Sequence, residues 1–375
     1  MLFPGLHAYR QSTTVDKAKR ERRTTLRRSD RKPQTLPADA IPWEVVQRPE
    51  RVVCIGDVHG DLEALACILY AQDLVDKKGD WCAAQTQLVL LGDLLGSEQS
   101  RLLVEFIIRI TRQAYRSGGA VHAILGNHDL LIFHHAKSPK AERKGSRRWP
   151  VNGAPGTSLR DAFCHNTHLA RWLRTRNAIL KIGRTIFVHA GLNSWALRHA
   201  PDRVNATIRA WVRFWQAVDV RPPDETGWLV SALTGQPTLD SSAGPLWTRS
   251  FKPQRTGDGR QVIALPRTAP DRDMVERIVS TLHGKRMVVG HAPSAGCRIL
   301  TAHPYYGNWV VMVDTRISDA KRGRLSCLEI VGDELTAHYS ERKKRGKRIV
   351  KRERKRLQRL CEAEAIHAAR RGAHA

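Results

Sequence analysis

The sequence has few acidic residues and no long apolar runs, and each of these shortages excludes a class of protein. Asp and Glu number 36 against 63 Lys and Arg, so the formal net charge is +27 and an acidic protein is excluded. No run approaches the roughly 18 consecutive apolar residues that a membrane-spanning helix needs, and the amino terminus lacks the pattern of a secretory signal. We therefore expect no membrane partner.

Cysteine is also scarce, and its pattern indicates neither disulfides nor a zinc site. The seven cysteines are odd in number and form no CxxC pair. Several lie in apolar runs, as Cys54 does in residues 52–55. We interpret them as reduced cysteines of a globular core, since hydrophobic residues make up 41% of the chain.

The excess positive charge is concentrated at the two ends of the chain. Lys and Arg outnumber Asp and Glu by ten to three in residues 1–36 and by fourteen to four in residues 341–375. We expect a disordered basic arm at the start, and a basic tail that is solvated or a single helix at the end. Such segments suit nonspecific binding of RNA or another polyanion, although no aromatic residue in the tail offers a surface for base stacking. The expected compartment is the cytoplasm, with nuclear import through the tail or an organelle as alternatives.

Between the basic ends, short apolar runs alternate with amphipathic segments. Helical spacing is present in residues 62–69 and 102–110. The apolar runs are typical of buried strands, so we predict an α/β fold. These runs occupy residues 52–55, 88–91, 121–125, 185–188, 287–289 and 310–313.

Two longer stretches are predicted to be insertions over this body. Residues 134–180 are polar and contain Gly and Pro, and the second stretch covers residues 200–245. The second includes a helical repeat whose tryptophans we interpret as core residues. This repeat consists of Ile208, Trp211, Val212, Trp215 and Val218.

Polar side chains suited to binding metal follow several of the predicted strands. In an α/β sheet the carboxyl ends of the strands converge, so these residues can meet although they are far apart in the sequence. Carboxylate, carboxamide and imidazole ligands without thiolate suit Mn, Fe or Zn, and this many ligands can hold two ions. The motifs are GDVHG (56–60), GD (92–93), GNHD (126–129), HAG (189–191) and GH (290–291).

In order and spacing, these motifs resemble the calcineurin-like metallophosphoesterase superfamily, and within it the Shewanella-like phosphoprotein phosphatases. The narrower resemblance rests on WLR (172–174), PLWTR (245–249) and VDT (313–315), followed by a closing strand near residues 325–330. It covers roughly residues 50–340. It implies a β-sandwich flanked by helices, with a dinuclear metal site at the strand ends, in a catalytic domain over residues 45–340.

Residue by residue, the resemblance implies a site that hydrolyses phosphate monoesters. His128 would be the general acid, with Asp129 orienting its imidazole, and Asn127 and Arg249 would bind phosphate. Two divalent ions would acidify a bridging water that attacks phosphorus in line. The implied metal ligands are Asp57 and His59 for the first ion, Asp93 as the bridge, and Asn127, His189 and His291 for the second.

One block departs from the family pattern. Relatives read GDxxDRG, whereas this chain has Gly96 and Ser97 in place of the second aspartate and the phosphate-binding arginine. Losing a bidentate arginine should weaken phosphate binding. We expect the double substitution Gly96→Asp with Ser97→Arg to restore these groups. The alternatives are that the loop follows a different path, so that an arginine at 97 points into solvent and changes nothing, or that Arg101 or Glu98 already fills these roles.

Three functions remain open at this point. The first is a metal-dependent phosphatase acting on phosphoproteins or small phosphate esters. The second is a hydrolase of nucleotide polyphosphates or capped RNA, similar to diadenosine tetraphosphatases. The third is a weakly active relative that binds phosphate or RNA.

Overall fold

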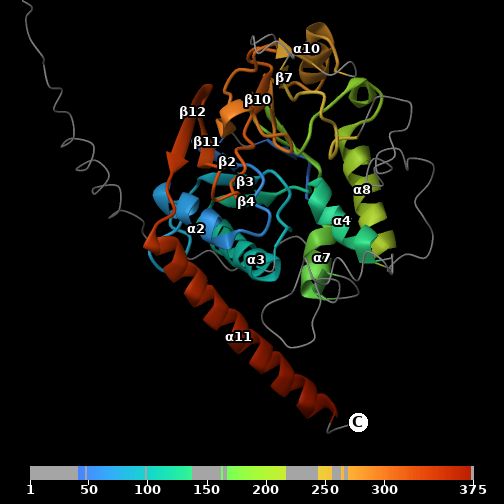
Figure 1. Cartoon of the computed structure of the whole chain (residues 1–375). Helices are drawn as coiled ribbons and strands as arrows, with labels where there is room; N and C mark the ends of the chain where they lie inside the picture. The colour runs from blue at the N-terminus through green and yellow to red at the C-terminus, as the bar shows by residue number, and fades with distance from the viewer. Residues whose placement is uncertain are drawn as a thin grey trace, which may run out of the picture. The chain divides into compact units, whose positions relative to one another are not determined.

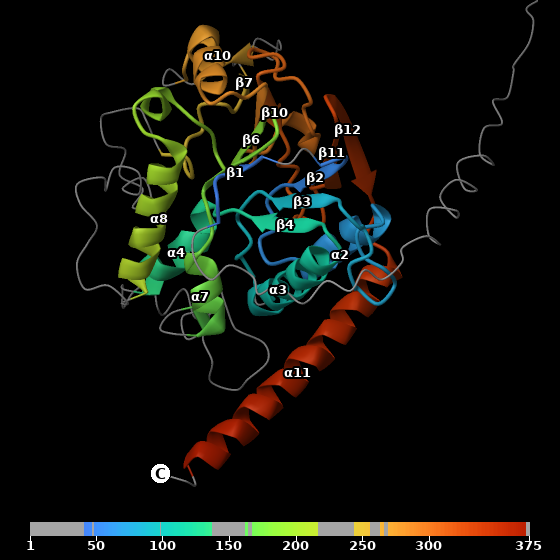
Figure 2. The same ribbon diagram turned by 180° about the vertical axis from the view of Figure 1, so that it is seen from behind.

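Two five-stranded sheets face each other in the computed structural model (Figures 1 and 2). The structure describes residues 41–46, 49–97, 99–136, 162–163, 167–216, 244–255, 263–265 and 269–372. The first sheet has the order β12 (Glu334–Ser340), β11 (Leu325–Val331), β2 (Val52–Ile55), β3 (Gln87–Leu90) and β4 (Ala120–Ala123). The second has the order β1 (Glu44–Val45), β5 (Ile179–Ile182), β6 (Thr185–Val188), β9 (Arg286–Val289) and β10 (Val310–Met312). A separate ribbon pairs β7 (Gln254–Arg255) with β8 (Ile263–Ala264).

The layers follow from side-chain alternation along the strands. In β2, Val52 and Cys54 join the apolar cluster between the sheets, which also contains Phe187 of β6. Val53 and Ile55 point to the other face and join the cluster that packs under the helices. All four residues of β2 are buried, which explains why the sequence of this strand is a continuous apolar run. The predicted β-sandwich flanked by helices is confirmed.

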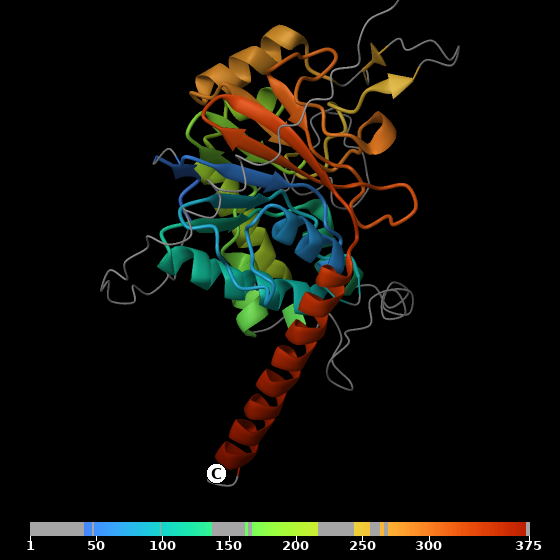
Figure 3. The same cartoon turned by 90° about the vertical axis from the view of Figure 1, so that its left-hand side faces the viewer.

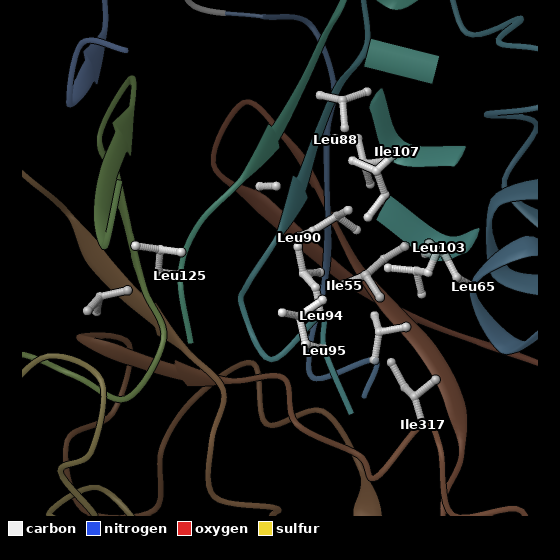
Figure 4. Close-up of a cluster of buried hydrophobic side chains, with 14 of the residues drawn as sticks. Ile55, Leu65, Leu88, Leu90, Leu94, Leu95, Leu103, Ile107, Leu125 and Ile317 are labelled. Atoms are coloured by element: carbon white, nitrogen blue, oxygen red, sulfur yellow. The ribbon is translucent and has the colours of Figure 1, made fainter. Parts of the chain in front are cut away.

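Helices cover the outer faces of both sheets. On the first sheet, Leu65 of α2 (Leu62–Ala71) and Leu103 and Ile107 of α3 (Ser100–Arg116) lie over Ile55 and Leu90 (Figure 4). Within the described part of the chain, no helix combines the length and apolarity needed to cross a membrane. The remaining helices are α4 (Asn127–Ala136), α7 (His168–Arg174), α8 (Pro201–Trp215) and α10 (Arg272–Thr281), with short 3-10 turns η1 (Ser194–Leu197) and η3 (Ala295–Cys297).

The structure adds strands that the apolar runs did not predict. β5 begins at Ile179, inside the stretch predicted to be a polar insertion, and α7 of that stretch buries Leu169 and Leu173. Residues 137–161 and 217–243 of the two predicted insertions lie outside the described residues. Cys54, Cys67 and Cys327 are buried as expected, but Cys82 is exposed.

The basic tail is not a solvated arm over its first half. It forms α11 (Lys344–Gly372), which starts beside α2 and packs on α2 and α3 (Figure 3). Ile349, Val350 and Leu357 are 0%, 7% and 4% exposed and belong to the core. The single helix is present as one of the expected alternatives, but it is not solvated all round, because a helix can bury one of its faces.

An ion-pair network around one buried carboxylate, that of Glu353, also holds α11 in place. The Glu353 carboxylate is 5% exposed and accepts hydrogen bonds from Arg109 Nη2 of α3 at 2.8 Å and from Arg356 at 2.6 Å. Arg109 also pairs with Asp80. Removing one partner of a buried pair leaves the other charge uncompensated, so this network fixes the position of α11.

Because α11 packs on the body through one face, shortening a buried apolar side chain and shortening an exposed one should have different effects on stability. Ile349→Ala should lower the free energy of unfolding by about 2–4 kcal/mol, because it opens a cavity against Phe106 and Gly79. Leu360→Ala on the same helix removes a side chain that is 53% exposed and should change stability by less than about 0.5 kcal/mol. Urea unfolding of both variants measures this, and equal effects would mean that α11 is not part of the core.

Candidate metal centre

The predicted ligands come together where strands of both sheets end. Asp57 and His59 follow β2, and Asp93 follows β3. β2, β3 and β4 are parallel to one another, as are β6 and β9, so their carboxyl ends open to the same side. The other predicted ligands follow the neighbouring strands in the same way: Asn127 after β4, His189 after β6 and His291 after β9.

The backbone is unusual at three of these positions. His59, Asp93 and His291 have φ values of 47°, 50° and 62°, in the left-handed region that residues with a Cβ rarely adopt. Local hydrogen bonds hold them there: the His59 N–H donates to the Asp93 carbonyl at 2.7 Å, and the His291 N–H donates to Asp57 Oδ1 at 3.1 Å. Such strain is concentrated at functional sites, where it aims side chains that regular backbone would point elsewhere.

Asp93 belongs to two groups of closely spaced ligand atoms. One group joins it with His59 and His128, and the other joins it with His189 and His291. Its Oδ2 lies 3.7 Å from His59 Nε2, and its Oδ1 lies 3.4 Å from His189 Nε2. This is the position that a bridging ligand between two ions would occupy, as the sequence predicted.

Asn127 lies beside the second group, and its side-chain oxygen faces the same two histidines. Asn127 Oδ1 lies 3.0 Å from His189 Nε2 and 3.1 Å from His291 Nδ1. Because His189 Nδ1 lies 2.8 Å from the Leu91 carbonyl, it donates its proton there and leaves the lone pair of Nε2 facing the cluster. His291 Nε2 is buried and has no hydrogen-bond partner among the described residues.

The electrostatics of the cluster also fit divalent cations. Burial and the nearby charge of His128 lower the pKa of His59 to about 4, and burial with the charge of Arg249 lowers the pKa of His291 to about 3. These imidazoles are therefore neutral at pH 7, as metal ligands must be. Burial also raises the pKa of Asp93. Two positive ions would offset this cost, so carboxylate, carboxamide and neutral imidazole together suit Mn, Fe or Zn.

Asp57 has a different environment from the other predicted ligands. It is 2% exposed, and both of its carboxylate oxygens accept the N–H of His291. It is not a member of either group of closely spaced ligand atoms. Burial and repulsion from Asp314 and Asp93 raise its pKa. Asp314, which is 4% exposed, was not among the predicted site residues. Asp314 follows β10 just as the predicted ligands follow their strands, and this position could have identified it as a candidate site residue.

Asp129 holds the loops of the site together. Its Oδ1 accepts the Leu95 N–H at 2.9 Å and its Oδ2 accepts the Gly126 N–H at 2.8 Å, so it joins the loops after β3 and β4. Burial raises its pKa to about 6. These bonds give Asp129 a role in loop geometry, and its orienting of the His128 imidazole stays a prediction.

The structure separates the two arginines predicted to bind phosphate. Arg249 is exposed and close enough to the cluster for its charge to act on His291. Arg101 is 8% exposed, and its guanidinium donates to Cys361 Sγ of α11 at 3.4 Å. Arg101 is thus directed toward α11, and the expectation that it reaches the phosphate is wrong in this structure. Glu98 lies outside the described residues.

The loop that departs from the family pattern has its own hydrogen bonds. Ser97 Oγ donates to the Gly60 carbonyl at 3.0 Å, and the Gly96 N–H donates to Ser100 Oγ at 3.0 Å. A Cβ at position 96 would lie 2.6 Å from the Cα of His59, which is closer than real contacts allow. The structure therefore argues against the expected restoration by Gly96→Asp with Ser97→Arg, because an aspartate at 96 collides with His59.

Comparison with known proteins agrees with this geometry. Residues 50–231 match the sequence model of the calcineurin-like phosphoesterase family. A solved cold-active protein tyrosine phosphatase from a psychrophilic Shewanella species shares the fold. It has a TM-score of 0.58 and 22% identity, and the alignment covers 81% of this chain and 84% of that one.

Relatives found by sequence similarity include two Shewanella-like protein phosphatases. Shewanella-like protein phosphatase 2 of Arabidopsis thaliana is 24% identical over 65% of this chain, and Shewanella-like protein phosphatase 1 of Plasmodium berghei is 29% identical over 46%. The alignments span 66% and 46% of the lengths of these relatives. A symmetrical bis(5'-nucleosyl)-tetraphosphatase of Paracidovorax citrulli is 33% identical over 46% of this chain and 57% of its own length.

The tight contact at position 96 predicts a loss of metal binding. Gly96→Ala should displace His59 and reduce the Mn²⁺ retained after gel filtration, because the added methyl group meets the His59 backbone. Gly332→Ala is the matched control: its φ of 58° makes it costly by about 1–2 kcal/mol, but its Cβ meets nothing within 4 Å. Normal metal content in Gly96→Ala would show that the loop yields without moving His59.

Proposed function

We propose that this protein is a metal-dependent phosphatase that hydrolyses phosphate monoesters, with phosphoproteins as the substrate class. The observation that carries the proposal is the shared position of buried Asp93 between a half-buried and a buried group of ligands, with Arg249 beside the second group. The Shewanella-like phosphatases among the relatives support the choice of substrate class.

Two divalent ions held by Asp57, His59, Asp93, Asn127, His189 and His291 would supply Lewis acidity and an acidified water. The chain's own residues would do the rest. Arg249 would bind phosphate oxygens through its exposed guanidinium, with Asn127 beside it. His128 would give a proton to the leaving oxygen, because its ring is half-buried and lies 4.7 Å from the ring of His59 at the edge of the cluster.

A second candidate is hydrolysis of a nucleotide polyphosphate. The 33% identity to a symmetrical bis(5'-nucleosyl)-tetraphosphatase favours it, and so does Gly96, because diadenosine-tetraphosphatase-like relatives also lack the second aspartate of that block. One assay separates the two candidates: phosphotyrosine and phosphoserine peptides, an aryl phosphate and diadenosine tetraphosphate, each supplied with Mn²⁺. Turnover of the dinucleotide alone would overturn the proposed phosphomonoesterase.

Metal dependence is the first requirement of the proposal. A chelator should abolish aryl phosphate hydrolysis and Mn²⁺ should restore it, while Asp93→Asn should lower both bound metal and activity because it removes the shared charge. Metal analysis and a rate measurement on the same samples check this. Undiminished hydrolysis by the metal-free protein would contradict it.

His128 provides a sharper test, because it groups with His59 and Asp93 as a candidate ligand. As a general acid it should contribute about 10²–10⁴-fold to the rate. His128→Ala should therefore lose turnover and keep its metal, whereas the comparison variant His59→Ala should lose both. If His128→Ala loses metal as His59→Ala does, the residue is a ligand and the assigned role is wrong.

A further inference from the structure

Helix α11 presents two different faces, and its cations divide between them. The inward cations have partners on the body: Arg356 pairs with Glu353 and Asp80, and the Arg345 guanidinium lies 5.1 Å from the centre of the Tyr70 ring. Arg352 donates to the carbonyl of Lys77. This face is fixed on the protein and is not available to a partner.

The opposite face carries a row of exposed cations, which we call the basic stripe. The ion pairs of the described residues involve none of these side chains. From residue 344 to residue 359 the only acidic residue is Glu353, which is buried, and the next one on the exposed surface is Glu362. The basic stripe consists of Lys344, Lys347, Arg348, Lys351, Arg354, Lys355 and Arg359.

The helix holds these charges at regular spacing. At 100° per residue, the seven positions fall within an arc of about 140°, opposite the arc that contains Ile349, Glu353 and Leu357. At a rise of 1.5 Å per residue, the basic stripe is about 22 Å long, which gives roughly one charge per 3 Å. One strand of duplex DNA carries a phosphate every 3.4 Å along its axis.

We propose that the basic stripe is a binding surface for the phosphate backbone of a double-stranded nucleic acid. A duplex offers a stiff, regular row of negative charges, and the stripe is a stiff row of positive ones because its helix is anchored by a core. Binding would be independent of sequence, since no aromatic residue lies along the stripe for base stacking. A membrane surface is disfavoured because the apolar face that would enter the lipid, with Ile349 and Val350, is already buried against the body.

The test measures binding of the full chain to a fluorescent duplex of about 20 base pairs over a range of salt concentrations. Each phosphate contact contributes about 0.9 to the slope of log K against log salt. The variant K347Q/K351Q/R354Q/K355Q should therefore reduce the slope by about 3–4, and K347Q/K351Q by about half of that. A second duplex of scrambled sequence should bind equally.

A matched variant controls for net charge. R203Q/R272Q/R277Q/K321Q removes four exposed cations elsewhere on the body and should change the slope by less than one unit. Equal losses in both quadruple variants would overturn the proposal in favour of nonspecific charge, and an unchanged slope in the α11 variant would place binding elsewhere. Binding of phosphatidylserine vesicles but not of the duplex, lost in the α11 variant, would identify a membrane partner and also overturn it. Aryl phosphate turnover, measured in parallel, should be the same in all variants.

Discussion

The metal centre depends on the burial of one carboxylate, that of Asp93. It is 1% exposed, yet it contacts groups from three different loops. Its Oδ1 accepts the His128 N–H at 2.8 Å and lies 3.4 Å from His189 Nε2, while its own carbonyl accepts the His59 N–H. A buried charge is tolerated only where it is paired or binds a cation, so the loops must close around this side chain in one arrangement.

Most of the residues proposed as ligands lie close together because the fold brings strand ends together. Each ligand follows a buried apolar run, and parallel strands place such positions at one edge whatever lies between them in the chain. The pattern carries no information about side-chain direction, so it did not predict the contacts that Asp129 and Arg101 make. Asp129 accepts hydrogen bonds from two backbone N–H groups, and Arg101 donates one to Cys361 Sγ. Spacing along the chain predicts neither contact.

For helix α11, the limitation is that the average composition of the segment hides the few residues that are buried. Composition alone makes residues 344–361 a charged segment, and mean polarity predicts solvation. The segment is ordered by a few residues on one face: Ile349, Leu357 and the carboxylate of Glu353, which finds Arg109 on α3. A helix with so few apolar residues is stable only against a surface that supplies the rest of the core, and that surface cannot be inferred from the helix itself.

The pairing of β2 with β11 has a consequence for synthesis of the protein. Cys54 lies opposite Leu328, and α11 covers α2 and α3, so the first half of the sandwich is closed by segments that are synthesised much later. At 5–20 residues per second, a ribosome needs roughly 15–55 seconds to travel between those two residues. During that interval the apolar faces of α2 and α3, and one edge of β2, are open to water and to other nascent chains. The core of the sandwich is therefore completed only once β11 and α11 have been synthesised and have docked on the earlier segments.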